Sequence, residues 1–193
     1  MITKMSKDNN AVIAMNAGGF YDPNWNSSGG VPHGVVISNG KLIANNKRAV
    51  SVGGIIGFNK ENKLVLAKMS AQQAINAGIR DAVDFGPFLI VNGESSFING
   101  NGGWGVSPRS AIAQRKDGVV LFLVVDGQNY VFGASLKDMI ETLQKYGAYN
   151  AANLDGGTSA TLIVNNKLIN KPSGGAASTN GRYVITGWGL LNG

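Results

Sequence analysis

Four short polar clusters flanked by glycine carry residue types that can do chemistry. They are residues 16–20, 108–110, 126–127 and 153–159. Each cluster follows or opens an apolar run, so we expect each to lie where a strand meets a loop. A carboxylate beside glycines has backbone N–H groups close by and room for a ligand. The clusters therefore form a candidate site, with Asp155 and Asp126 as its carboxylates.

Each candidate also has an ordinary structural interpretation. Asp-Gly is common turn chemistry, which applies to Asp126 more than to Asp155, because Asp155 stands in a longer Gly-Gly-Thr-Ser context. Arg109 heads a predicted strand, where its guanidinium can grip a phosphate or form a structural ion pair. Arg182 has the same two interpretations in a weaker context. His33 closes a Gly/Ser/Asn loop, where an ordinary loop histidine is the simpler interpretation.

Aromatic residues in predicted loops add a possible sugar contact. Tyr21, Trp25 and Trp104 can stack on a sugar ring or simply pack their own loops. The familiar catalytic signatures are missing: GGTSA is not a G-x-S-x-G elbow, and the chain has neither a P-loop nor a dinucleotide glycine fingerprint.

Composition narrows the class of protein. The 193 residues include 28 glycines, 22 asparagines, one histidine and no cysteine. This excludes a disulfide scaffold, thiolate metal sites, a thiol nucleophile and a multi-histidine metal cage. The net charge is +6, but only 15% of residues are charged and no run of four basic residues occurs, which argues against nucleic acid. A mild positive field suits an acidic, phosphate-bearing polymer. No apolar run approaches the ~18 residues of a membrane span.

The elements that must position the clusters are mostly hairpins. Asn39-Gly40, Asn92-Gly93 and Asn165-Asn166 are turn signals between apolar runs, and two further hairpins are predicted over 55–67 and 111–127. Two helices are expected, one over 70–77 and one capped by Ser135 with a stripe at Leu136, Met139, Ile140, Leu143 and Tyr146.

These signals predict one α+β domain over residues 1–193, with a mixed, largely antiparallel sheet system and a few helices. Residues 1–9 read as the tail of a third helix whose start lacks a cap. We therefore expect the chain to be trimmed at its N-terminus.

Seven motifs occur in order and with consistent spacing from about Lys4 to the C-terminus. They are AMNAGGFYD, GVPHGVVISNGKL, FGPFLIVNGE, PRSAIAQRKDG, VVDGQ, GASLKDM and YGAYNAANLDGGTSATL. Together they resemble the phosphodiester glycosidase family. The family's last motif is often Gly-Gly-Gly-Ser-Ser, and here Thr158 keeps a hydroxyl in the corresponding stretch.

The resemblance implies a hydrolase that cleaves a sugar-1-phosphate diester, such as one of N-acetylglucosamine, to free sugar and a phosphomonoester. It implies a phosphate-bearing glycan or glycopolymer as substrate and an extracytoplasmic, secreted or cell-surface location. Asp155 and Asp126 are then the catalytic carboxylates and Arg109 the anion clamp. The predicted substrate-binding residues are Asn16, Gly18, His33, Gly156, Gly157, Thr158 and Ser159.

Two other functions stay open at the level of sequence. A non-catalytic carbohydrate- or wall-binding module would keep the aromatic loops without needing Asp155 beside Arg109. A metal-dependent phosphodiesterase would need several carboxylates on one ion, and the spacing admits only Asp126, Asp155, Asp22 and Glu94. We expect no required cofactor and no catalytic metal, although loop carboxylates leave room for a structural calcium ion.

Overall fold

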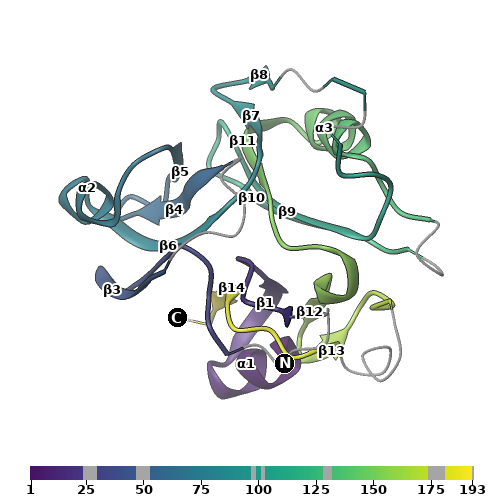
Figure 1. The fold of residues 1–193 in the computed structure, drawn as a ribbon, viewed down its shortest axis with the longest axis horizontal. Helices are drawn as coiled ribbons and strands as arrows, with labels where there is room; N and C mark the ends of the chain where they lie inside the picture. The colour runs from purple at the N-terminus through teal and green to yellow at the C-terminus, as the bar shows by residue number, and fades with distance from the viewer. Residues whose placement is uncertain are drawn as a thin grey trace.

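Three antiparallel sheets, each with its own helix, make up the fold of the computed structural model (Figure 1). The structure describes residues 1–23, 30–46, 53–96, 99–100, 103–127, 132–173 and 181–192. Trp25, one of the residues predicted to contact a sugar, lies outside these ranges. The predicted α+β class with largely antiparallel pairing is confirmed.

The terminal sheet has the strand order β13-β12-β1-β14 and joins the two ends of the chain. Its elements are α1 (Ile2–Asp8), β1 (Ala11–Asn16), β12 (Leu162–Val164), β13 (Lys167–Leu168) and β14 (Gly187–Leu191). The short helix α1 packs on this sheet, with Ile2 buried against Ala14 and Ile163. Both ends of the ribbon therefore lie beside this sheet (Figure 1).

The α2 sheet has the strand order β3-β2-β6-β4-β5. Its elements are β2 (Val35–Ser38), β3 (Lys41–Asn45), β4 (Gly54–Asn59), β5 (Leu64–Ala67), α2 (Ala71–Asn76) and β6 (Ile79–Phe85). Ala71 and Ala74 of α2 pack on Ile37 and Ile55. Ser70 and Gln73 form the capping box that starts the helix, as Ser70 predicts.

The α3 sheet has the strand order β10-β9-β11-β7-β8. Its elements are β7 (Phe88–Val91), β8 (Glu94–Ser95), β9 (Arg109–Arg115), β10 (Val120–Val125), α3 (Leu136–Lys145) and β11 (Ala148–Asn153). Ser135 and Asp138 form the predicted capping box. Four residues of the predicted stripe are buried, namely Leu136, Met139, Ile140 and Leu143. The fifth, Tyr146, follows the helix and is 65% exposed.

All five predicted hairpins form, and their turns have the backbone that the sequence predicts. Asn39, Gly40, Asn92 and Gly93 all have positive φ, as do the two asparagines at 165–166. Type I′ turns need positive φ at both central residues, which asparagine and glycine tolerate. The abundance of these two residues thus reflects the number of tight turns.

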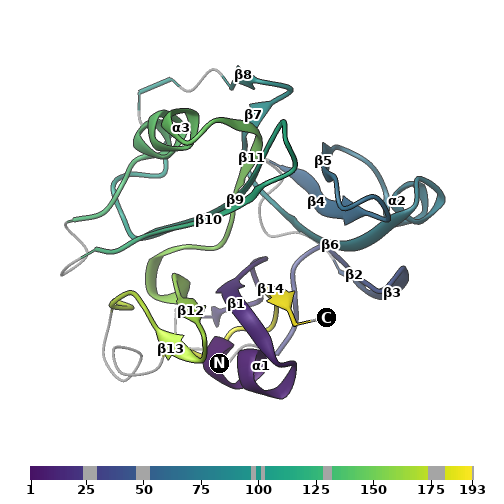
Figure 2. The same ribbon diagram turned by 180° about the vertical axis from the view of Figure 1, so that it is seen from behind.

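The inner faces of the three sheets meet in one central cluster (Figures 1 and 2). Met15 comes from the terminal sheet, Ile56 and Val83 from the α2 sheet, and Ile112 and Ala152 from the α3 sheet. Each sheet therefore has a helix on one face and this shared core on the other. Loops leaving all three sheets meet at the rim of the shared core, and three of the four polar clusters lie there.

Candidate functional site

The Asp155 turn is fixed between the terminal sheet and the α3 sheet. The Asp155 N–H donates to the Ala17 carbonyl at 3.0 Å, and the Gly157 N–H donates to the Pro108 carbonyl at 2.8 Å. A Cβ on Gly156 would lie 2.7 Å from the Pro108 carbonyl oxygen, so no side chain fits there. Gly157 has φ +59°, a conformation that glycine adopts without strain. The close approach to Pro108 thus requires glycine at 156, and the positive φ favours it at 157, which places the carboxylate at the junction of two sheets.

Asn16 joins three segments at this junction. Its side-chain amide donates to the Asp155 carbonyl at 2.5 Å, and its oxygen accepts from the Ser110 hydroxyl at 2.8 Å and the Thr161 N–H at 3.1 Å. The side chain is 0% exposed. Asn16 therefore acts on the site by holding the Asp155 turn, rather than by facing a ligand.

The Asp155 carboxyl has the environment of a group that exchanges a proton. The residue is half-buried, and its carboxyl group is enclosed by protein. Burial raises the pKa of Asp155 to about 6, while hydrogen bonds from the Ser159 hydroxyl and the Gly156 N–H and the charge of Arg182 act in the opposite direction. The negative charge of Asp22 acts with burial to keep this pKa high. A carboxyl group with a pKa near neutrality is suited to general acid–base catalysis.

Arg182 is the cation that acts on Asp155. Its Nη1 donates to Asp22 Oδ2 at 2.7 Å and to the Thr158 hydroxyl at 3.3 Å. Its guanidinium lies 4.9 Å from the ring centroid of Phe20, within cation–π range. Asp22 and Phe20 follow β1, whereas Arg182 precedes β14, so the strands of the terminal sheet bring these residues together. The sequence alone indicates Asp22 only as a candidate metal ligand. It favours Arg109 over Arg182 as the anion-binding residue, because the context of Arg182 is weaker.

Arg109 has a different environment from the one its sequence context predicts. It is 4% exposed, and its guanidinium donates to the carbonyls of Ala134, Trp104 and Gly105 at 3.1, 2.6 and 2.8 Å. Burial lowers its pKa from the usual arginine value. Side chains alternate along β9, so Ser110 reaches Asn16 while Arg109 points to the opposite face of the strand. Through these three bonds the Arg109 guanidinium anchors loop backbone.

Asp126 is exposed at the end of β10 and stabilises a neighbouring segment. Its carboxylate accepts from the Lys171 N–H at 3.0 and 3.1 Å and from the Asn170 side-chain amide at 2.8 Å. Asn170 in turn donates to the Ala160 carbonyl. Asp126 is thus tied to the end of the Asp155 turn through Asn170, and its carboxylate caps backbone.

The glycines after β1 bring His33 and β6 close to Asp155. The Gly18 N–H donates to the Thr186 hydroxyl at 3.0 Å, and the His33 N–H donates to the Gly19 carbonyl at 2.9 Å. A Cβ on Gly19 would lie 2.8 Å from the Phe85 ring, which contacts Trp104 edge-on at 6.2 Å. Predicted residues Gly18 and His33 therefore lie in the same neighbourhood as Asp155, and Tyr21 is exposed nearby.

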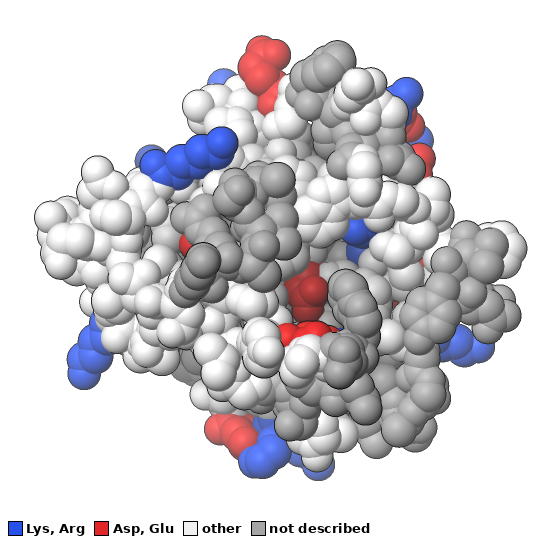
Figure 3. Space-filling view, in the orientation of Figure 1, with Lys and Arg blue, Asp and Glu red and all other residues white. Residues whose placement is uncertain are grey.

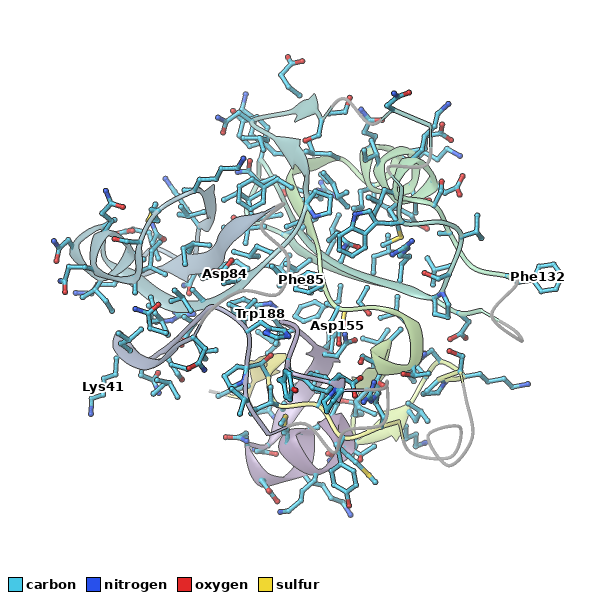
Figure 4. All side chains as sticks on the ribbon, in the orientation of Figure 1. Lys41, Asp84, Phe85, Phe132, Asp155 and Trp188 are labelled. Atoms are coloured by element: carbon cyan, nitrogen blue, oxygen red, sulfur yellow. The ribbon has the colours of Figure 1, made fainter. Side chains whose placement is uncertain are left out.

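Asp84 is a buried carboxylate that the sequence interpretation missed. It is the next-to-last residue of β6 and is 3% exposed, and its carboxyl lies against Gly34, which has φ +66° and no room for a Cβ. Figure 4 places Asp84, Phe85, Trp188 and Asp155 in the middle of the molecule, while Lys41 and Phe132 lie at its periphery. Figure 3 shows acidic side chains inside a hollow in the middle of the same face. The sequence offers no clear signal for it, because Asp84 lies within a strand that also contains Arg80 and Asp81, and Phe85 separates it from Gly86.

The carboxylates do not gather into a metal cage. Within the described residues, no group of three or more aspartate, glutamate or histidine side chains is placed to hold an ion. Asp22 pairs with Arg182, Asp126 binds backbone, and Glu94 is exposed on β8 at the edge of the α3 sheet. No helix in the described part of the chain is long and apolar enough to cross a membrane.

Two proteins, one bovine and one bacterial, are similar to this chain in sequence. The chain is 27% identical over 160 residues to the N-acetylglucosamine-1-phosphodiester alpha-N-acetylglucosaminidase of Bos taurus, covering 69% of this chain and 29% of that protein. It is 30% identical over 182 residues to the SPbeta prophage-derived protein YomE of Bacillus subtilis (strain 168), covering 90% of this chain and 27% of that protein. The chain thus spans less than a third of the length of either relative.

The fold is that of a solved zebrafish structure. The catalytic domain of zebrafish N-acetylglucosamine-1-phosphodiester alpha-N-acetylglucosaminidase, auto-inhibited by its pro-peptide, matches with a TM-score of 0.82 at 23% identity. The match covers 100% of this chain and 67% of that one. A family model described as phosphodiester glycosidase matches residues 9–191, and the chain belongs to that family.

Proposed function

We propose that this domain hydrolyses a sugar-1-phosphate diester at the glycosidic C–O bond, releasing free sugar and a phosphomonoester. The observation that carries the proposal is the Asp155 carboxyl, enclosed beside Arg182 and the Thr158 and Ser159 hydroxyls, with its pKa raised to about 6. Family membership supports the reaction type, and the name of the bovine relative supports N-acetylglucosamine as the sugar.

The chemistry requires one carboxylate at the sugar and donors at the phosphate. A phosphate on the anomeric carbon is a good leaving group, so it needs less protonation than the alcohol of an ordinary glycoside. Asp155 acts at the anomeric carbon, where a carboxylate supports the positive charge of an oxocarbenium-like transition state. Arg182 and the Thr158 hydroxyl beside it supply N–H and O–H groups for the departing phosphate.

The natural substrate and location form part of the same proposal. A phosphodiester-linked sugar on a surface glycan or glycopolymer fits the net charge of +6, and such polymers lie outside the cytoplasm. The reaction as written needs no metal, because attack at carbon leaves the phosphate as the leaving group. Treatment with a chelator should therefore leave turnover intact, and metal-reversible loss of turnover in folded protein would favour a metal-dependent phosphodiesterase.

Isotope labelling tests which bond breaks. Hydrolysis of the methyl phosphodiester of N-acetylglucosamine-1-phosphate in oxygen-18 water should place the label on the anomeric hydroxyl of the sugar. Label in methyl phosphate would mean attack at phosphorus and would contradict the glycosidase mechanism. Absence of turnover with this and other sugar-1-phosphodiesters would instead favour a binding module. Fresh product analysed by NMR shows inversion if Asp155 activates water, or retention if it is a nucleophile.

A further inference from the structure

We propose that Arg182 binds the phosphate of the substrate and that Asp22 is the positioning residue that aims Arg182 at it. This inference rests on the proposed function, since it assigns the phosphate half of that site. It gives the anion-binding role to a residue close to the C-terminus instead of to Arg109.

The position of Arg182 is fixed from three directions. Asp22 Oδ2 accepts from Nη1 at 2.7 Å, the Thr158 hydroxyl lies 3.3 Å from the same nitrogen, and the Phe20 ring lies 4.9 Å from the guanidinium carbon. The side chains of Arg182 and Asp22 are 14% and 13% exposed, so the pair is screened from bulk water yet reached by it. An arginine held in this way loses little conformational entropy when an anion binds.

The neighbours of Arg182 are the donors of the Asp155 turn. Thr158 is the third residue after Asp155, and the short turn Gly157–Ser159 carries a second hydroxyl that bonds to the Asp155 carboxyl. A phosphate beside Thr158 would meet the Arg182 guanidinium and the Thr158 hydroxyl together. Arg109 lies on the opposite face of β9, where its Nε and Nη2 donate to three backbone carbonyls.

Asp22 is a positioning residue because a carboxylate repels phosphate and cannot itself bind it. It accepts a hydrogen bond from Arg182 Nη1, while the charge of the same guanidinium also acts on Asp155. Asp22 and Arg182 are the two charged groups that act on Asp155 from the loops of the terminal sheet, with opposite effects on its pKa. Loss of the Asp22 charge would let Arg182 pair with Asp155, which would occupy the anion-binding group and lower the pKa of Asp155.

Phosphate binding tests the assignment without relying on turnover. We would measure the Kd of inorganic phosphate by calorimetry for the wild type, Arg182→Gln, Arg182→Lys and Arg115→Gln. Arg115 is a matched control, because it also pairs with an aspartate, Asp117 at 2.6 Å, at the distant β9–β10 turn. Loss of charge-assisted hydrogen bonds should weaken phosphate binding by about tenfold or more in Arg182→Gln. Arg182→Lys should retain part of it, and Arg115→Gln should match the wild type.

Asp22→Asn separates positioning from simple structural support. The variant should raise KM about fivefold or more with a smaller change in kcat, and it should move the Asp155 carboxyl titration, followed by carbon NMR, to lower pH. Equal phosphate binding by wild type and both Arg182 variants, or an unmoved Asp155 titration in Asp22→Asn, would overturn the inference. Selective loss of phosphate binding in the Arg182 variants, in a protein that hydrolyses no sugar phosphodiester, would keep the anion site and refute the proposed function alone.

Discussion

Two Asp-Gly turns that look alike in the sequence have different surroundings in the fold. Asp126 ends β10 at the surface, where its carboxylate accepts the Lys171 N–H and the Asn170 amide. Asp155 follows β11 into the junction of two sheets, where its carboxyl is enclosed and its pKa is raised to about 6. The dipeptide forms the same kind of strand end in both places. Whether the carboxylate stabilises backbone or can exchange a proton depends on segments distant in the sequence.

The two arginines differ in the same way. The buried Arg109 guanidinium donates to three backbone carbonyls. Two belong to the loop before β9, and the third is that of Ala134. The Arg182 guanidinium meets a carboxylate and a hydroxyl beside Asp155. A guanidinium that binds carbonyls supports structure, whereas one among charged and hydroxyl groups at a partly exposed site can exchange a partner for an anion.

The largest difference should appear when each aspartate becomes asparagine. Asp155→Asn keeps the shape of the turn and removes the proton-exchanging group, so kcat on a sugar-1-phosphodiester should fall by on the order of 10²-fold or more. Steady-state kinetics on protein with an unchanged circular dichroism spectrum would measure this. Near wild-type turnover by folded Asp155→Asn would move the catalytic role to another carboxylate, with Asp84 the next to test.

The next largest effect is expected on stability at Arg109. Arg109→Lys keeps the charge but loses the planar fork that reaches three carbonyls, so buried oxygens lose donors. We expect a loss of about 2–3 kcal/mol in the free energy of unfolding, which for a domain of this size lowers Tm by roughly 4–12 °C. Denaturant and thermal melts would measure it, with Arg115→Lys as an exposed control. A stability equal to that of the wild type would mean that the carbonyls are satisfied in another way.

Local features of the fold were predictable because nearby residues determine them. Asn39-Gly40 and Asn92-Gly93 specify their own turns through positive φ, and Ser135 with Asp138 specifies a helix start through bonds three residues apart. Helical periodicity predicts that Tyr146 continues the apolar stripe, but the helix ends at Lys145 and the tyrosine is exposed. Periodicity does not say where a helix stops.

The site was only partly predictable because its contacts span the chain. The sequence placed Asp155 and the hydroxyls of Thr158 and Ser159 correctly in one turn, since they are neighbours in the sequence. The pair between Arg182 and Asp22 joins residues 160 positions apart, and no local pattern predicts it. Asp84 lies within β6, and no motif distinguishes it from a structural aspartate.

A comparable effect is expected on how the free energy of unfolding depends on pH, through the ionisation of Asp155. Because the pKa of Asp155 is about 6 when folded, against ~3.9 in an unfolded chain, the folded state holds the proton more tightly between these pH values. Ionisation of this group therefore costs stability as pH rises from about 4 to 6, by about 3 kcal/mol in total. Asp155→Asn should be more stable than the wild type above pH 7, and this difference should shrink as pH falls to about 4. Urea melts across this range would measure it, and a constant difference would contradict the raised pKa.

The smallest effect should come from Asp126→Asn, which completes the comparison of the two turns. The variant replaces a carboxylate that accepts the Lys171 N–H with both oxygens, so one acceptor and the charge are lost. Hydrogen bonds to charged groups at exposed sites contribute modestly, so we expect a stability loss of about 1 kcal/mol. Turnover should change by less than about threefold, because Asp126 reaches the Asp155 turn only through Asn170. A fall in kcat comparable to that of Asp155→Asn, in protein that melts normally, would show that both Asp-Gly turns act in the reaction. The different surroundings of Asp126 and Asp155 would then give the two carboxylates two different catalytic roles. Asp126 would no longer be a purely structural residue.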